Sequence, residues 1–233
     1  MAVASIYTTN EYLTKNPTWD IEHSSWKAKN LMSIIKRNDL QLTSICEVGC
    51  GAGEILNSMH KQMDENIVFT GYEISPDAFD LCKQRIKDRL NYKLADLLED
   101  ESVFFNLIMA VDVVEHIEDY YGFLRKLKEK ANFFIFSIPL EMCVVNILKV
   151  SHLLRTREQY GHIHYFEKET FLMTLRDIGY EIVDLFYAPT TLTFPSKRIT
   201  TKILRFPRKF AYKYNCDTLI KTIGGFALMI LAK

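Results

Sequence analysis

The sequence predicts an α/β fold built on a doubly wound, mostly parallel sheet. The first indication is residues 45–53, Ile-Cys-Glu-Val-Gly-Cys-Gly-Ala-Gly, where a β-prone run ends in three glycines at alternate positions. Glycine lets the backbone turn tightly and approach a ligand, because no Cβ stands in the way. A helix-prone run follows from Glu54, and strand, glycine turn and helix in this order are typical of the nucleotide pocket of such folds. The second indication is that strand-like and helix-like segments alternate through the middle of the chain.

Local patterns predict each element in order. The apolar run 104–111 suits a strand that is buried on both faces, and Pro76 is expected at the first position of a helix. An apolar stripe within 118–130 indicates a helix that packs on the sheet, and Pro139 ends the strand before it. Strands are expected over 44–49, 67–74, 91–95, 104–111, 133–138, 180–187 and 223–231, and helices over 24–38, 53–63, 76–89, 118–130, 141–157 and 168–178.

The bulk composition favours a single domain, 1–233. A chain of 233 residues with 48% apolar content can bury a substantial core. Its 29 basic and 29 acidic residues balance, so no global field favours nucleic acid as a partner. Five cysteines, an odd number, indicate buried free thiols in a reducing compartment. With no recognisable signal peptide and no apolar run of about 18 residues, we expect a cytoplasmic protein.

Three segments are expected to surround the sheet. Residues 1–38 form an N-terminal lid and the first helix, 139–165 form a cap over the pocket, and 188–220 form a basic insertion between the sixth and seventh strands. The length of this insertion predicts helical structure of its own. Within it, 197–213 is rich in lysine and arginine, and three interpretations are open. It contacts an anionic substrate, it makes a peripheral contact with an anionic membrane surface, or it is a solvated helix face.

The spacing of the glycines indicates which kind of nucleotide ligand the turn binds. A dinucleotide fingerprint requires G-x-G-x-x-G, but Glu54 stands where the third glycine would fall. The motif G-x-G-x-G preceded by an acid resembles motif I of the class I S-adenosylmethionine-dependent methyltransferases. EVGCGAGEIL, GYEISPDA, DVVEHIEDYYGFL and GHIHYF follow in the order that this family has, over about 45–187. The resemblance implies a Rossmann-like, seven-stranded sheet with an antiparallel last strand.

The same resemblance implies S-adenosylmethionine as cofactor and assigns its contacts. Glu73 follows Gly49 by 24 residues, where an acid accepts hydrogen bonds from both ribose hydroxyls. Asp96 and Leu97 match the position that contacts the adenine, and Asp112 the methionine half. The full set of expected cofactor-binding residues is Glu47, Gly49, Cys50, Gly51, Gly53, Glu73, Ile74, Asp96, Leu97, Val111 and Asp112.

Histidines supply the expected catalytic groups. His162 and His164 are two residues apart, so they point the same way if the chain is extended there. A neutral imidazole takes up a proton near physiological pH, as methylation of a hydroxyl requires. His116 is either a third base or a structural residue. A metal site is not expected, because the sequence shows no third ligand beside this pair.

The sequence therefore predicts methyl transfer from S-adenosylmethionine to oxygen or nitrogen of a small molecule. The motifs are most similar to a bacterial subgroup linked to polysaccharide and surface-glycan synthesis, which suggests an anionic or sugar-linked acceptor. The alternatives are a non-catalytic S-adenosylmethionine-binding or nucleotide-binding partner subunit, a protein methyltransferase, and an NAD-dependent enzyme, which Glu54 disfavours.

Overall fold

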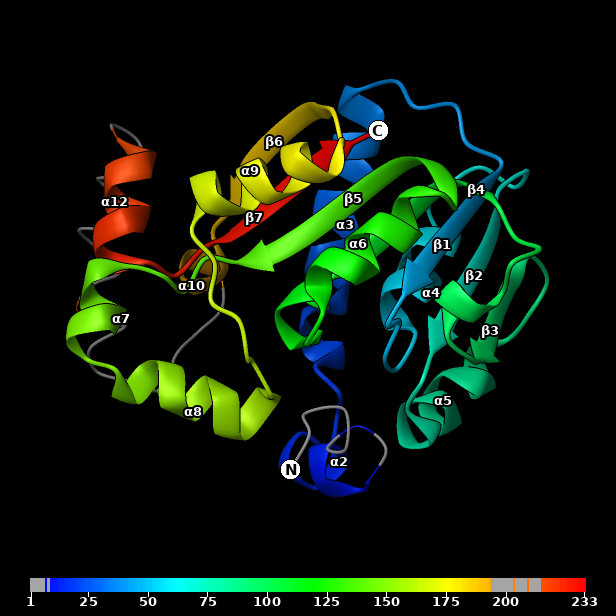
Figure 1. The fold of residues 1–233 in the computed structure, drawn as a ribbon. Helices are drawn as coiled ribbons and strands as arrows, with labels where there is room; N and C mark the ends of the chain where they lie inside the picture. Colours follow the sequence, from blue (N-terminus) through cyan, green and yellow to red (C-terminus); the bar gives the residue numbers. More distant parts are fainter. Residues whose placement is uncertain (1–6, 8, 194–202, 204–208, 210–214) are drawn as a thin grey trace.

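A seven-stranded sheet forms the centre of the protein, as a computed structural model shows for residues 7, 9–193, 203, 209 and 215–233 (Figure 1). The strand order is β3-β2-β1-β4-β5-β7-β6. β7 runs antiparallel to both of its neighbours, and the other pairings are parallel. The predicted fold class is thereby confirmed. The strands are β1 (Ser44–Val48), β2 (Val68–Glu73), β3 (Leu90–Leu94), β4 (Phe105–Val111), β5 (Ala131–Pro139), β6 (Ile182–Ala188) and β7 (Ala227–Ala232).

Helices cover both faces of this sheet. On one face α3 (Ile21–Arg37) and α4 (Glu54–His60) pack with Ile45, Phe69 and other buried strand residues. On the other face α6 (Tyr120–Lys128) and α9 (Lys168–Ile178) pack with Cys46, Phe134 and their neighbours (Figure 1). Successive residues of a strand thus enter opposite layers, and both layers are apolar, as a doubly covered sheet requires. The remaining helices are α2 (Glu11–Lys15), α5 (Pro76–Cys82), α7 (Val144–Leu148), α8 (Ser151–Tyr160), α10 (Thr190–Thr193) and α12 (Cys216–Ile223), with 3₁₀ turns η1 (Lys83–Arg85), η2 (Leu97–Glu99) and η3 (Val114–His116).

The winding direction reverses between β1 and β4. β1 pairs in parallel with β2 on one side and with β4 on the other, and Val48 lies opposite Ala110. The segments that leave β1 and β4 therefore emerge side by side and turn to opposite faces. In open α/β sheets, the crevice outside such a switch point is where ligands bind.

Several elements begin or end differently from the sequence expectations. The last strand begins at Ala227 because Gly224 and Gly225 adopt positive φ (67° and 90°) and separate it from α12. The helix expected over 76–89 ends at Cys82 and continues as a 3₁₀ turn. The apolar segment expected as one helix over 141–157 forms two short helices, α7 and α8.

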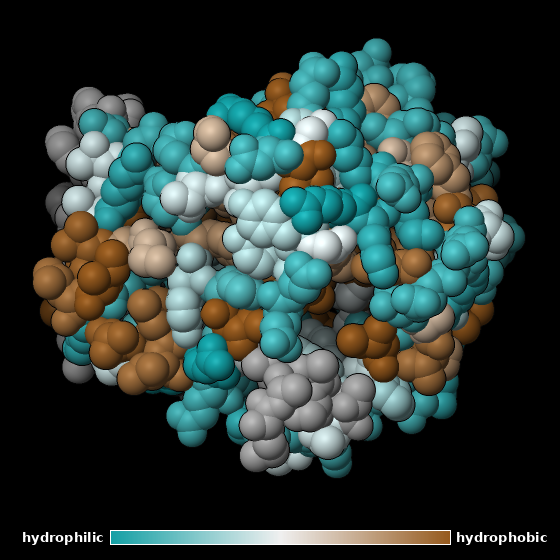
Figure 2. Space-filling view, viewed as in Figure 1, coloured by the Kyte–Doolittle hydropathy of each residue, from teal (hydrophilic) through white to brown (hydrophobic). Residues whose placement is uncertain are grey.

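The helices α7 and α8 expose apolar side chains. Leu148 is 82% exposed, and Val144, Val145, Ile147, Val150 and Leu154 are also exposed. These residues belong to the brown area over α7 and α8 in Figure 2. Most of the basic segment 197–213 lies outside the described residues. The described parts of the insertion 188–220 include α10 and the start of α12, so they are helical as expected. In the part of the chain that the structure describes, no helix is long and apolar enough to cross a membrane.

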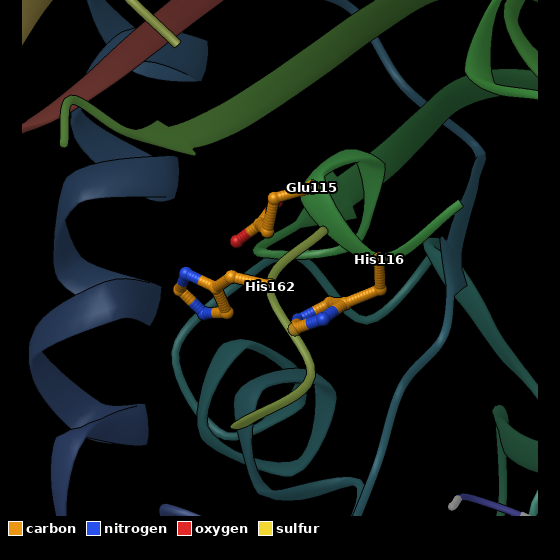
Figure 3. A group of neighbouring side chains, drawn as sticks. All are labelled: Glu115, His116 and His162. Atoms are coloured by element: carbon orange, nitrogen blue, oxygen red, sulfur yellow. The ribbon is translucent and has the colours of Figure 1, made fainter. Parts of the chain in front are cut away.

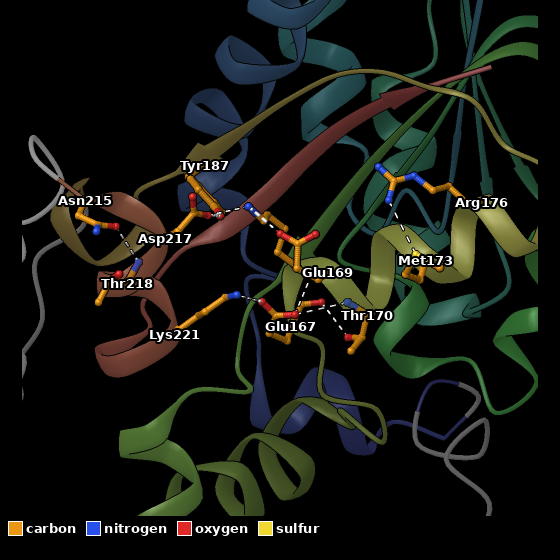
Figure 4. A network of polar contacts seen from close by, with 11 residues as sticks. Glu167, Glu169, Thr170, Met173, Arg176, Tyr187, Asn215, Asp217, Thr218 and Lys221 are labelled. Carbon is orange, nitrogen blue, oxygen red and sulfur yellow. Dashed lines mark hydrogen bonds and ion pairs between the residues drawn. The ribbon is translucent and has the colours of Figure 1, made fainter.

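A polar network fixes α12 against α9 and β6. Lys168 pairs with Asp217 at 2.6 Å, and the Tyr187 hydroxyl donates a hydrogen bond to the same carboxylate. Lys221 of α12 lies 3.5 Å from Glu167, which caps α9 by accepting from the backbone N–H of Glu169 (Figure 4). Because α12 leads directly into β7, this network holds the antiparallel strand in place.

Candidate active site

A cavity of about 620 Å³ opens at the switch point between β1 and β4. Its walls come from parts of the chain that are distant in sequence. They include residues 15–20 with Lys27, the glycine turn after β1, Val111 and Asp112 with Glu115 and His116, and the pair Tyr160 and His162. Apolar groups line part of the cavity, while carboxylates and histidines gather in the rest, an arrangement suited to a polar ligand.

The glycine turn after β1 needs its glycines. Gly49, Gly51 and Gly53 have φ of 65°, 54° and 75°, a region that other residues rarely adopt. A Cβ on Gly51 would lie 2.6 Å from Cδ1 of Trp19, and one on Gly53 would lie 2.6 Å from Cε1 of Tyr92. The turn therefore brings its backbone against its neighbours more closely than any side chain permits.

Glu73, at the end of β2, is bonded to this turn. Its carboxylate is buried and accepts hydrogen bonds from the backbone N–H groups of Gly51 (2.7 Å), Ile74 (2.9 Å) and Ser75 (2.8 Å). Burial raises the pKa of Glu73, although the three N–H groups act in the opposite direction. The predicted ribose acid is thus fixed in position relative to the glycine turn.

The expected cofactor residues divide into two groups. Seven of them line the cavity: Glu47, Gly49, Cys50, Gly51, Gly53, Val111 and Asp112. The other four, Glu73, Ile74, Asp96 and Leu97, lie outside its lining. Asp96 caps η2 by accepting from Leu98 N–H at 2.8 Å, and Leu97 is fully buried in the core. The structure therefore gathers the turn and the end of β4 in one cavity and places the ends of β2 and β3 beside it.

Lys27, one of the residues that line the cavity, forms ion pairs with two acids. Lys27 of α3 lies 2.7 Å from Asp20 and 3.1 Å from Asp112. Burial opposes its charge, but the carboxylates of Asp112 and Asp20 raise the pKa of Lys27 above its ordinary value. Asp112 has φ of 54° and also accepts from the Ser137 hydroxyl at 3.2 Å, so several contacts hold a strained backbone position. Sequence reasoning missed Lys27, since nothing in WKAKNL marks it as the partner of an acid after β4.

Glu47 is a buried acid that faces the cavity. It is 1% exposed, and its Oε2 accepts no hydrogen bond from the described residues. Burial raises the pKa of Glu47 well above its usual range. An unsatisfied buried carboxylate is unfavourable unless a donor or a cation reaches it, so this end of the cavity suits a cationic group.

Three titratable side chains meet at another part of the cavity. Glu115 and His116 belong to η3, and His162 follows α8; their side chains point toward one another (Figure 3). One ligand atom from each lies within 4.8 Å of the others. His162 Nδ1 lies 2.6 Å from Oε2 of Glu141, whereas His116 Nδ1 lies 3.2 Å from the carbonyl oxygen of Gly161. Burial, with a further contribution from His162, lowers the pKa of His116 to about 4.

The predicted catalytic histidines do not all reach the cavity. His116 and His162 line it, with ring centroids 4.9 Å apart. His164 lies outside the lining, with Nε2 3.3 Å from the carbonyl oxygen of Glu118 and its ring against Tyr120. Residues 161–166 are not in a β-strand, so the alternation that would align His162 and His164 does not hold.

Glu115 is a second residue of the cavity that sequence reasoning did not single out. It is 0% exposed, and neither oxygen accepts a hydrogen bond from any described residue. Burial, together with the carboxylates of Asp112 and Glu141, raises the pKa of Glu115 well above its usual range. In the sequence, Glu115 is one acid among several between 112 and 119, and only the fold shows that it is buried.

We expect Glu115→Gln to stabilise the ligand-free protein at pH 7, because burial raises the pKa of this carboxyl well above its usual range and makes its charged form costly. A carboxyl whose folded pKa is raised stabilises the fold below its unfolded pKa, and this contribution is lost as the pH rises through the folded pKa. The gain from the substitution should therefore vanish near pH 4. Thermal unfolding across this pH range measures it, with Glu118→Gln as an exposed control. An equal gain at both pH values would contradict the assignment.

An aromatic segment covers one side of the cavity. The rings of Tyr7, Tyr12 and Trp19 stand in sequence, with centroids 5.0 and 4.5 Å apart. The Tyr7 hydroxyl lies 2.9 Å from Nδ1 of His116. Lys15 donates to the carbonyl oxygen of Glu158 near the end of α8, so the N-terminal segment meets α8 beside the cavity.

Comparison with known proteins gives the family. A family model described as a methyltransferase domain matches residues 22–185. The fold is similar to that of magnesium protoporphyrin IX methyltransferase from Synechocystis PCC 6803 with bound S-adenosylhomocysteine, with a TM-score of 0.60 and 13% identity over 89% of this chain and 82% of that one. It is also similar to an S-adenosylmethionine-dependent methyltransferase from Archaeoglobus fulgidus, with a TM-score of 0.57 and 18% identity over 88% and 94% of the two chains.

At these identities the two solved structures show a shared fold, and the family model, which spans most of the chain, shows the family. The glycine turn, the acid that ends β2 and the switch-point cavity agree with it. The chain belongs to the class I S-adenosylmethionine-dependent methyltransferases.

Proposed function

We propose that this chain transfers the methyl group of S-adenosylmethionine to oxygen or nitrogen of a small molecule bound in the same cavity. The observation that carries this proposal is the cavity itself. One cavity at the switch point is lined both by the glycine turn after β1 and by Glu115, His116 and His162. Methyl transfer is an in-line displacement, and holding the acceptor in line with the methyl can supply on the order of 7–11 kcal/mol of the barrier.

The cofactor is proposed to lie against the glycine turn. Its sulfonium and ammonium groups are cationic, and the carboxylates of Glu47 and Asp112 line this part of the cavity. Opposite charges attract strongly where water is excluded. Glu73 is proposed to bind the ribose hydroxyls, while Asp96 and Leu97 bind the adenine. Because these three lie beside the cavity, the nucleoside would extend past Gly51 toward the ends of β2 and β3.

The acceptor is proposed to lie at the histidine end. Of the three predicted bases, His162 is best placed, since it lines the cavity and its Nδ1 is fixed by Glu141. His116 is a weaker base because its pKa is lowered to about 4 by burial, and His164 lies outside the lining. Residues 1–38 and 139–165 are proposed as lid and cap, supported by the contact between Lys15 and the end of α8.

The acceptor class remains a prediction of the sequence resemblance, which favours a sugar or glycan precursor. The cytoplasmic location, the single-domain organisation and the membrane or substrate contact of 197–213 remain predictions as well. Nucleic acid is disfavoured by the balanced charge of the chain. A non-catalytic partner subunit and a protein methyltransferase are the alternatives to the small-molecule enzyme.

Calorimetric titration with S-adenosylmethionine and with NADH tests the cofactor. We expect the former to bind and the latter not to bind, because Glu54 stands where the dinucleotide fingerprint needs its third glycine. Binding of NADH alone would refute the proposal. Radiolabelled methyl incorporation into a metabolite extract then separates an enzyme from a binding subunit, and incorporation into protein alone would favour the protein methyltransferase.

A further inference from the structure

We propose that Glu115, His116 and His162 bind a divalent first-row transition-metal ion at the acceptor end of the cavity. The binding site itself follows from the geometry of these residues, whereas its catalytic role rests on the proposed methyl transfer. The sequence indicated no metal because only His162 and His164 stood close together. The fold supplies the missing ligands by placing η3 against the segment after α8 (Figure 3).

The three ligand groups come from two backbone segments that are bonded to each other. The Glu115 carbonyl oxygen accepts hydrogen bonds from the backbone N–H groups of Ile163 (3.0 Å) and His164 (3.1 Å). These bonds fix the position of His162 relative to Glu115 and His116. One nitrogen or carboxylate oxygen from each residue lies within 4.8 Å of the others.

Hydrogen bonds orient both imidazoles as metal ligands. His162 Nδ1 faces the Glu141 carboxylate at 2.6 Å, and His116 Nδ1 faces the Gly161 carbonyl at 3.2 Å. A carboxylate and a carbonyl only accept. The Tyr7 hydroxyl, 2.9 Å from His116 Nδ1, donates its own hydrogen to the Tyr160 carbonyl oxygen at 2.6 Å, so the hydrogen-bond pattern assigns the proton of each ring to Nδ1. The lone pair of each ring is then on Nε2. Metal-binding histidines are typically held in this way, with the other ring N–H donated to a carboxylate or a backbone carbonyl.

Glu115 supplies the negative charge. It is fully buried, and both of its oxygens lack a hydrogen-bond partner among the described residues. Leaving a carboxylate in this state is costly, and buried charges are normally paired or bound to a metal. A cation between Glu115 and the two neutral imidazoles removes that penalty. This part of the cavity therefore suits a cation, which would take the place of the missing hydrogen-bond donors.

The ligand set selects the kind of ion. Imidazole nitrogen suits zinc, iron, cobalt or nickel, whereas magnesium and calcium prefer oxygen ligands. Three protein ligands leave a coordination position open, as in catalytic rather than structural zinc sites. Metal–nitrogen bonds of about 2.0–2.1 Å would bring the ligand atoms to roughly 3–3.5 Å from one another, so binding draws these side chains inward.

An acceptor hydroxyl at the open position would be activated by the ion. A bound cation lowers the pKa of the hydroxyl, which releases its proton to solvent. The oxygen then attacks the methyl carbon, the C–S bond breaks, and its electron pair remains on sulfur as a neutral thioether. His162 Nε2 has one lone pair, so it binds the ion or accepts a proton, but not both. The inference thus favours hydroxyl over amine acceptors.

Cobalt provides the test, because Co²⁺ bound to imidazole and carboxylate gives visible d–d absorption. Chelator-treated protein is titrated with Co²⁺ by absorption and with Zn²⁺ by calorimetry, and Mg²⁺ is the comparison ion. We expect Co²⁺ and Zn²⁺ to bind at one site and more tightly than Mg²⁺. Glu115→Gln and His162→Ala should weaken this binding by more than the roughly 10–100-fold that follows loss of an outer-shell partner. His164→Ala, two residues from His162 but outside the cavity lining, should leave it unchanged.

Each result decides the inference. Absence of Co²⁺ absorption in the wild type overturns it, as does unchanged binding in Glu115→Gln or loss of binding in His164→Ala. Glu115→Gln is expected to stabilise the metal-free fold at pH 7, so weaker metal binding in that variant does not reflect unfolding. S-adenosylmethionine titration with and without chelator separates the two proposals. Cofactor binding without metal binding refutes the metal site alone, whereas metal binding without cofactor binding refutes the proposed function.

Discussion

Replacing His162 by alanine is expected to lower kcat by roughly 10²–10⁴-fold, the usual contribution of a group that helps to remove the acceptor proton. His162 faces the cavity, and Glu141 holds its ring at 2.6 Å. The glycine turn and Glu73 do not contact it through any hydrogen bond in the described structure, so affinity for S-adenosylmethionine should be unchanged. The same loss is expected whether His162 accepts the proton itself or binds an ion that acidifies the hydroxyl.

Release of S-adenosylhomocysteine in a metabolite extract measures this turnover, and calorimetry measures the cofactor affinity. Glu141→Gln tests the orientation of the ring. It retains an acceptor oxygen, so its kcat should fall less than that of His162→Ala. His60→Gln is a matched control, because His60 contacts the carbonyl oxygen of Asp88 away from the cavity lining. Full turnover in His162→Ala would remove this residue from the mechanism.

The sequence was sufficient for the fold because its strongest signals are local. Gly49, Gly51 and Gly53 mark a turn through their conformational freedom, and the structure gives all three positive φ. The link between Gly51 and Glu73 could also be anticipated, since parallel neighbouring strands end at the same edge of a sheet. Such features depend on residue type and on strands that follow one another in the sequence, and both can be recognised in the sequence.

The acceptor end depends on contacts that no local pattern displays. Lys27 meets Asp112 only because α3 packs behind the sheet with its N-terminal end near the carboxyl end of β4. Glu115 and Glu118 are both glutamates in the same short stretch of sequence. They differ in that the folded protein buries Glu115 and exposes Glu118. The orientation of His162 and His164 depends on an irregular segment after Gly161, where side chains do not alternate as they do along a β-strand. Side chains whose role follows from burial and from irregular backbone therefore required the structure.

Replacing Gly51 by alanine is expected to weaken S-adenosylmethionine binding by about 100-fold or more, which corresponds to at least about 2.7 kcal/mol. Gly51 has φ of 54°, and an added Cβ would lie 2.6 Å from Cδ1 and 2.8 Å from Nε1 of Trp19. Its N–H also donates to Glu73 at 2.7 Å, so a shift of the turn displaces the proposed ribose acid as well. The substitution thus alters both the surface and the hydrogen bonding proposed to hold the cofactor.

A positive-φ glycine elsewhere separates this effect from general strain. Gly179 ends α9 with φ of 97° outside the cavity lining, and its Cβ would meet only the flexible end of Lys128. Gly179→Ala should therefore lower the unfolding free energy through the same backbone strain, about 1–2 kcal/mol, and leave cofactor affinity unchanged. Calorimetry gives the affinities, and fluorescence of Trp19 and Trp26, which both line the cavity, gives an independent signal. Equal affinities for S-adenosylmethionine in Gly51→Ala and Gly179→Ala would mean that the glycine turn does not hold the methyl donor. Backbone strain at a positive-φ glycine would then account for the affinity of both variants.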